Sequence, residues 1–174
     1  MACSKGAPGN HVYVPRMAVN PDIDNFRVIC GVNPAMVRKD PTSWDMAGQN
    51  NPVDAAQVER TLDAMALLLA RKPSAPDAWK TIFRKPDSKS WNSTIAAIKV
   101  NCIGKNHPRL AVVNKICIEL NRLGVQCQNI FIYDGTHNAD QFYTSYVGKA
   151  LPAGVIVSDK NKALGGTVKL SIPD

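Results

Sequence analysis

Residues 94–101 read Thr-Ile-Ala-Ala-Ile-Lys-Val-Asn, and residues 129–134 read Asn-Ile-Phe-Ile-Tyr-Asp. Both are short apolar runs rich in β-branched residues and bounded by polar ones, a pattern typical of buried strands. Between them, apolar residues recur at helical spacing, which predicts one buried helical stripe made by Leu110, Val113, Cys117 and Leu120. A strand, a helix and a second strand in this order predict a parallel unit.

The ends of this central helix are also marked in the sequence. Pro108 lies near its predicted start, and Gly124 stands where a left-handed C-terminal cap is expected. The helix is therefore expected to begin shortly after residue 108 and to end before residue 124.

The rest of the chain continues the alternation of strands and helices. Residues 26–32 predict a first strand, and Asn51 and Pro52 predict the start of a long helix. The core face of that helix is expected to carry Val58, Leu62, Met65 and Leu69. A shorter helix over residues 75–83 should pack Trp79 against Phe83.

The last third predicts one more helix and two more strands. Asn138 and Gln141 have the spacing of a capping box, and the helix that they start is expected to carry Phe142, Tyr146 and Ala150 on one face. Residues 155–157 and 167–172 predict two strands that could form an antiparallel hairpin.

These elements predict one α/β domain over residues 26–174, with a mainly parallel sheet flanked by helices and an antiparallel strand pair near the C-terminus. Residues 1–25 contain repeated Gly, Pro and Asn breaks and predict an irregular tether. The chain stops directly after a strand, so we expect that a partner covers the sheet edge or that the chain is a truncated piece of a longer protein.

Composition narrows the classes of function. The 174 residues are 45% apolar and 20% charged, which is typical of a folded domain, and no apolar run is long enough to cross a membrane. The net charge of +7 raises the possibility of nucleic-acid binding. Because the basic residues are scattered and form no Lys/Arg cluster, no nucleic-acid partner is predicted.

The five cysteines provide no local metal-binding pair. They contain no Cys-X-X-Cys spacing, so an iron–sulfur cluster is not expected. Cys30 and Cys117 are interpreted as core residues. Cys102 follows a strand end, where a reactive thiol is possible, but an inert buried thiol is the favoured interpretation. Cys3 follows small residues, as in the cleavage region of a bacterial lipoprotein, but no apolar leader precedes it; lipidation or an ordinary start both remain open.

Polar residues follow both central strands. Lys99 and Asn101 are two apart and therefore share a face of their strand, and Asp134 ends the next strand. Carboxyl ends of parallel strands are where ligands bind in such sheets. We therefore expect Lys99 and Asn101, with Lys105 in the following loop, to bind a small anionic ligand; a structural pair of Lys99 with Asp134 is the alternative.

Histidines in the neighbouring loops could add chemistry to this end of the sheet. His137 with Asp134 forms the candidate catalytic pair, with His137 as general base. His137, Asp134 and Asp140 are also the candidate ligands if a divalent metal is bound, although no cofactor is predicted. His107 could reach the same crevice from the other loop.

The strand ending in Lys99-X-Asn101, the helix with Leu120 and Gly124, and the strand ending in Asp134 resemble the uncharacterised family named domain of unknown function 362. The resemblance runs from about residue 26 onward. It implies an often exported bacterial protein of unestablished activity, in which some members carry iron–sulfur modules. The chain departs from that pattern because it has no ferredoxin-like cysteine run, no complete export signal and an earlier end.

Two functions follow from these observations. The first is binding of a small anion at the strand ends, with an enzymatic activity possible. The alternative is a non-catalytic module of a larger exported or redox-associated protein, in which the polar strand ends only cap the sheet.

Overall fold

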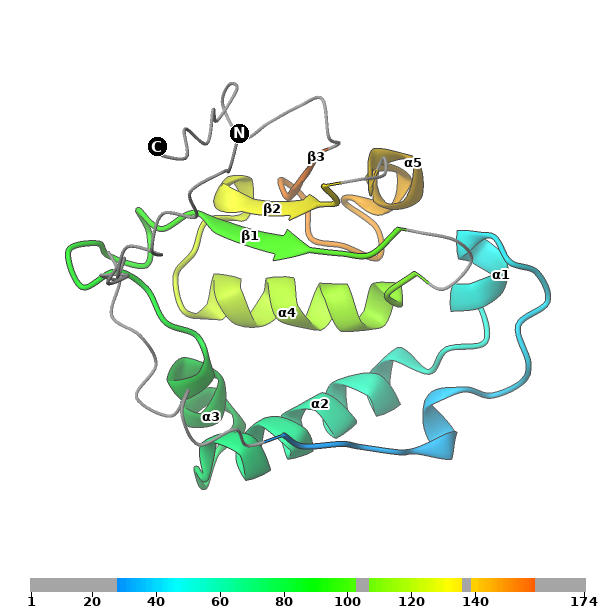
Figure 1. The fold of residues 1–174 in the computed structure, drawn as a ribbon, viewed down its shortest axis with the longest axis horizontal. Helices are drawn as coiled ribbons and strands as arrows, with labels where there is room; N and C mark the ends of the chain where they lie inside the picture. Colours follow the sequence, from blue (N-terminus) through cyan, green and yellow to red (C-terminus); the bar gives the residue numbers. More distant parts are fainter. Residues whose placement is uncertain (1–27, 103–106, 136–138, 159–174) are drawn as a thin grey trace, which may run out of the picture.

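The computed structural model describes residues 28–102, 107–135 and 139–158. Its centre is a three-stranded parallel sheet in the order β1 (Ala96–Lys99), β2 (Ile130–Tyr133) and β3 (Ile156–Ser158). The predicted parallel pairing of the first two strands is confirmed, with Ile98 opposite Ile132. The chain therefore has the α/β fold that its central segment predicts (Figure 1).

Helix α4 (Leu110–Arg122) connects β1 to β2 and covers one face of the sheet (Figure 1). All four residues of its predicted apolar stripe are buried and join the main core cluster. Gly124 has a φ of +108° and donates its backbone N–H to Asn121. Only a residue without a Cβ adopts this backbone easily, so the predicted C-terminal cap is confirmed.

The third strand joins the sheet in parallel. β3 follows α5 (Ala139–Tyr143) and the short 3₁₀ turn η4 (Thr144–Tyr146), and it pairs with β2 through Phe131 and Ile156. A helical crossover returns the chain to the same end of the sheet, which makes the new strand parallel. Residues 167–172, the predicted antiparallel partner, lie outside the described residues.

The predicted first strand is wrong in its described part. Residues 28–32 form no strand, and Val28, Val32 and Cys30 are exposed, so Cys30 is not a core residue. This segment runs beside a helix instead of a strand, and the Asn33 side chain donates a hydrogen bond to Thr61 Oγ1 on α2. Its apolar residues therefore form no ladder with any strand in the described part of the chain.

Helices α1 (Met46–Asn50), α2 (Ala55–Ala70) and α3 (Ala75–Ile82) precede the sheet. α2 packs against α4 and α3 packs against α2, so two helical layers lie on the same side of the sheet (Figure 1). The predicted start of the long helix is wrong by a few residues. Asp54, not Asn51, caps α2 by accepting the backbone N–H of Gln57, because the chain first makes the short helix α1.

Two aromatic predictions have different outcomes. Trp79 and Phe83 stack with their ring centroids 5.5 Å apart, as predicted. The predicted face of α5 is wrong, because the helix ends at Tyr143 and the chain continues as η4. Tyr143 is consequently the fully buried ring, its hydroxyl donating to the backbone oxygen of Pro108.

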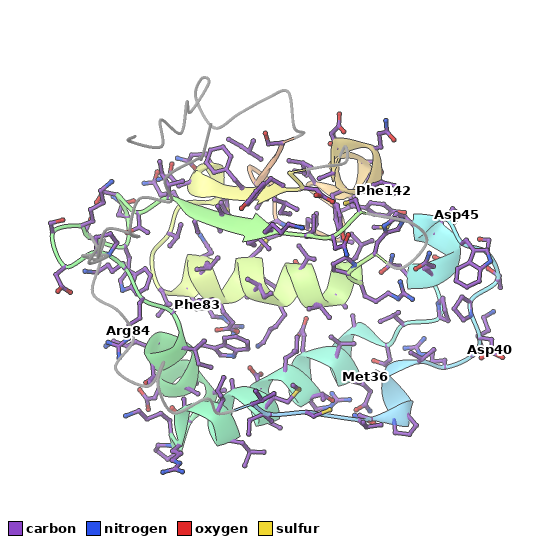
Figure 2. The ribbon with its side chains drawn as sticks, viewed as in Figure 1. Met36, Asp40, Asp45, Phe83, Arg84 and Phe142 are labelled. Atoms are coloured by element: carbon purple, nitrogen blue, oxygen red, sulfur yellow. The ribbon has the colours of Figure 1, made fainter. Side chains whose placement is uncertain are left out.

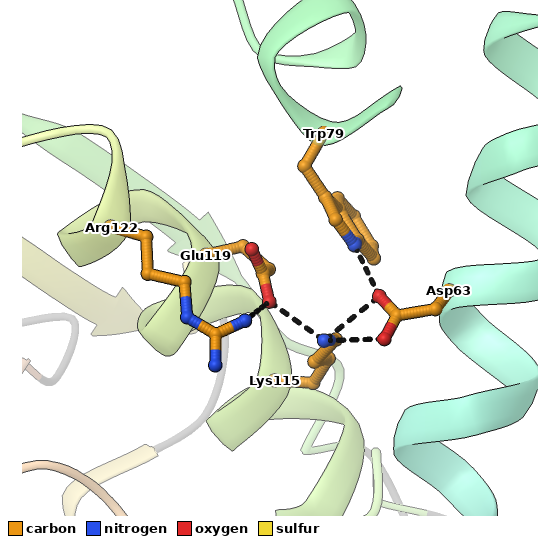
Figure 3. A network of polar contacts seen from close by, with 5 residues as sticks. All are labelled: Asp63, Trp79, Lys115, Glu119 and Arg122. Carbon is orange, nitrogen blue, oxygen red and sulfur yellow. Dashed lines mark hydrogen bonds and ion pairs between the residues drawn. The ribbon is translucent and has the colours of Figure 1, made fainter. Parts of the chain in front are cut away.

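A buried network of charged side chains joins the two helical layers (Figure 3). Lys115 on α4 is 4% exposed and lies 2.8 Å from Asp63 on α2 and 2.7 Å from Glu119. The Trp79 indole N–H donates to the same Asp63 carboxylate, and Arg122 pairs with Glu119. Burial alone would lower the pKa of Lys115, but its hydrogen bonds to Asp63 and Glu119 outweigh burial and raise that pKa.

Replacing Lys115 by Met should lower the free energy of unfolding by about 3–5 kcal/mol, since the buried Glu119 would keep only the largely exposed Arg122 as its cation and Asp63 would lose its ion pair. Urea denaturation followed by circular dichroism measures the change. Lys80→Met on the exposed surface of α3 is the matched control and should change stability by less than about 0.5 kcal/mol. Equal losses in the two variants would contradict a bridging role for Lys115.

Candidate functional site

The candidate site lies at the carboxyl ends of β1 and β2. The strands run toward the side of the molecule where α1 and α5 lie (Figure 1). α5 contacts both β2 and β3, and Phe142 on this helix lies near the strand ends (Figure 2). This end of the sheet is therefore partly covered, and burial differs greatly between its polar residues.

Asp134 is placed by the end of β2 and is almost fully buried. Its Oδ2 accepts the backbone N–H of Cys102 at 2.6 Å, and its Oδ1 lies 3.8 Å from Nζ of Lys99. A buried carboxylate requires such partners to offset its lost hydration. Asp134 therefore joins the ends of β1 and β2.

Lys99 is the accessible member of this ion pair. Its side chain is 56% exposed, whereas that of Asp134 is fully covered, and Nζ also donates to the backbone oxygen of Val100 at 3.2 Å. Side chains alternate along β1, so Lys99 lies on the strand face opposite Ile98 and Val100, which pack into the core. Asn101 is exposed as well, in agreement with the prediction that it shares a face with Lys99.

Cys102 differs from a reactive thiol. It is 2% exposed and belongs to the core cluster. Burial, followed by the negative charge of Asp134, raises the pKa of its thiol to about 11. Because the thiolate is the nucleophile, this environment favours the interpretation of Cys102 as a core residue.

His107 is brought to the same region by the segment before α4. It is 6% exposed and its ring centroid lies 4.0 Å from that of Phe142. Its Nδ1 has no hydrogen-bond partner among the described residues. Burial, then the nearby Arg109 charge, lowers the pKa of His107. The expectation that His107 reaches this end of the sheet thus agrees with its position beside α5.

Two residues of α1 that the sequence analysis did not single out hold the start of α4. Asn50 Oδ1 accepts the backbone N–H of Leu110 at 2.8 Å, and Gln49 Oε1 accepts a hydrogen bond from Arg109. Arg109, the N-cap residue of α4, makes no side-chain cap of its own. Asn50 therefore caps a helix 60 residues further along the chain, a relation that no local pattern indicates.

The remaining predicted site residues are Asp140, Lys105 and His137. Asp140 is partly exposed, and its Oδ1 accepts the backbone N–H of Gln141. Lys105 and His137 lie outside the described residues. Within residues 28–102, 107–135 and 139–158, no group of three or more His, Cys, Asp or Glu side chains could hold a metal ion. The metal and catalytic assignments that depend on His137 stay predictions.

The comparisons give no relative from which a function could be transferred: no family model, curated protein or solved structure matches the chain. None of the helices in the described residues has the length and apolarity needed to cross a membrane.

Alkylation should separate the cysteines by exposure. Iodoacetamide at about pH 8 should modify Cys30 in the native protein, whereas Cys102 and Cys117 should react only after unfolding in urea, because both are buried and have raised pKa values. Peptide mass spectrometry of native and urea-treated samples measures the difference. Rapid modification of Cys102 in the native protein would contradict this environment.

His107 should make the protein less stable in mild acid. Its pKa is lowered in the folded state, so below its ordinary value of about 6.5 the unfolded chain binds more protons than the folded one. The free energy of unfolding should therefore fall as the pH drops from about 7 to 5. His107→Phe, which keeps a ring against Phe142, should show a smaller fall in urea titrations across this range. An unchanged pH profile would exclude His107 as its source.

Proposed function

We propose that the chain binds a small anion, a phosphate or carboxylate compound, at the carboxyl end of its sheet through Lys99, Asn101 and Lys105. The observation that carries this proposal is the half-exposed side chain of Lys99 at the end of a parallel strand. This is the edge of an open α/β sheet where ligands bind. An amide side chain beside the cation, here Asn101, can orient a bound oxyanion.

Asp134 positions Lys99 in this proposal. It is anchored by the Cys102 N–H, and its carboxylate lies close to the Lys99 ammonium group without being exposed itself. This arrangement favours a positioning role for Asp134 over direct proton transfer. A catalytic activity would depend on His137 as the base, with Asp134 orienting it.

The same geometry is compatible with the alternative that the strand ends only cap the sheet of a non-catalytic module. The burial of Asp134 is the observation that favours this alternative, because a fully covered carboxylate contributes to structure without touching a ligand. Membership in the domain of unknown function 362 family, and with it export from the cell, also stays a proposal. Its support is the sequence resemblance at Lys99, Asn101, Leu120, Gly124 and Asp134.

Thermal-shift measurements with phosphate and with citrate test the anion proposal. Both anions should raise the melting temperature of the unmodified protein, and the shift should be lost in Lys99→Ala because the exposed cation is removed. Lys80→Ala removes the same charge from α3 and should keep the full shift.

Two outcomes would refute anion binding at Lys99. The first is a protein that neither anion stabilises, with Lys99→Ala altering only its melting temperature; this result favours the capping module. The second is an equal loss of the shift in Lys99→Ala and Lys80→Ala, which would indicate a general effect of net charge.

A further inference from the structure

An open cavity of about 330 Å³ lies beside the start of α4. Three parts of the chain form its walls: α1 with the turn into the start of α2, the N-terminal part of α4, and the end of η4 with the turn after it. Lys99 and Asp134 are not among its lining residues. Its volume is in the range of small-molecule sites.

The interior of this cavity is apolar and unfilled because its walls carry small side chains. Leu110 and Val53 provide apolar surface, and alanines occupy the positions where longer side chains would fill the space: Ala47, Ala55, Ala111 and Ala150. An apolar part of a ligand can therefore enter without displacing a core residue.

Besides Asn50, whose side chain caps α4, four polar side chains line the same cavity: Asn51, Asn114, Tyr146 and Lys149. Asn114 lies on α4, Tyr146 ends η4, and Asn51 and Lys149 lie in the turns after α1 and η4. No hydrogen bond or ion pair joins any of these side chains to another described residue, which leaves their polar groups available to a ligand. A mainly apolar cavity with a few such groups is the usual composition of a ligand site.

The positive charge of the lining favours an anionic ligand. Lys149 is the cation of the cavity, and no Asp or Glu is among the described residues that line it. The nearest acidic residue in sequence, Asp54, pairs with Arg38 and caps α2. A bound carboxylate would therefore meet Lys149 without a competing carboxylate in the wall.

The cavity walls are held in place independently of any ligand. Asn50 caps α4 through Leu110 and thereby fixes α1 against α4. The turn that carries Lys149 is closed by backbone hydrogen bonds from Lys149 and Leu151 to the oxygen of Tyr146. Within that turn Gly148 has a φ of +76°, which a residue with a side chain rarely adopts.

From these observations we propose that the cavity between α1, α4 and the turn at Lys149 is a binding site for a small amphipathic carboxylate. The apolar body of the ligand lies against Leu110 and the alanines, and its carboxylate pairs with Lys149. Asn114 and Tyr146 also line the cavity, and their amide and hydroxyl groups would bind a further polar group of the ligand.

Isothermal titration with 3-phenylpropanoate, compared with its uncharged amide, tests the site. The acid should bind the unmodified protein at least about tenfold more tightly than the amide, because only the acid makes a charge-assisted hydrogen bond to Lys149. Lys149→Gln should weaken binding of the acid by about tenfold and leave the affinity for the amide unchanged. Lys80→Gln, the matched control on α3, should alter neither affinity. Ala111→Phe should abolish binding of both compounds by filling the cavity.

The outcomes distinguish this site from the one at Lys99. Lys99→Ala should leave 3-phenylpropanoate binding intact; binding that is lost in Lys99→Ala but kept in Lys149→Gln would overturn the proposal and favour the strand-end site. Absence of saturable binding by the unmodified protein, or equal effects of Lys149→Gln and Lys80→Gln, would also overturn it. If Ala111→Phe does not fold, backbone amide NMR spectra of the unmodified protein test the location of the site. Adding 3-phenylpropanoate should shift the signals of Ala47, Asn114 and Lys149, and unshifted signals would refute the location.

Discussion

The position of Lys115 between two carboxylates is the interaction on which the layered arrangement depends. α4 is the only described helix that packs directly on one face of the sheet while also meeting α2, and Lys115 is the charged group at that second contact. A buried cation tolerates few alternative positions, because each shift of α2 would separate it from Asp63 without offering water in exchange. An apolar contact could slide at lower cost. The network therefore selects one packing of the helical layers, and Trp79 extends that selection to α3 through the same carboxylate.

The central strand–helix–strand unit was predictable because its determinants are local. The apolar stripe of α4, the left-handed backbone at Gly124 and the polar ends of both strands are each encoded within a few neighbouring residues. Residues 26–32 have the same β-branched pattern, but the described part of that segment lies beside α2 and pairs with none of the described strands. The composition of a segment indicates its propensity to form a strand. Strand formation also requires a neighbouring strand, and the whole fold decides whether one is present.

The candidate site also has features that local sequence predicts and features that depend on the whole fold. The shared face of Lys99 and Asn101 was predicted from the two-residue period of a strand, and both residues are exposed, in agreement with that prediction. Burial of Asp134 and Cys102 depends on α5 lying over the strand ends, which no spacing in the sequence indicates. The cavity at Lys149 was not predicted, because its walls come from three separate parts of the chain and its main feature is unfilled space beside alanines.

The cap that Asn50 places on α4 has a consequence for the order in which the molecule assembles. Most helices receive their first hydrogen bonds from adjacent residues, so they can form before the rest of the chain is in place. The Leu110 N–H at the start of α4 instead receives its acceptor from a segment 60 residues earlier in the chain, and closing so long a loop is entropically costly. The rest of α4 can therefore become helical early, whereas the cap on its first residue forms only when α1 docks. Folding of this chain should thus end at the helix start that forms the cavity wall, and local opening of the native molecule should begin there.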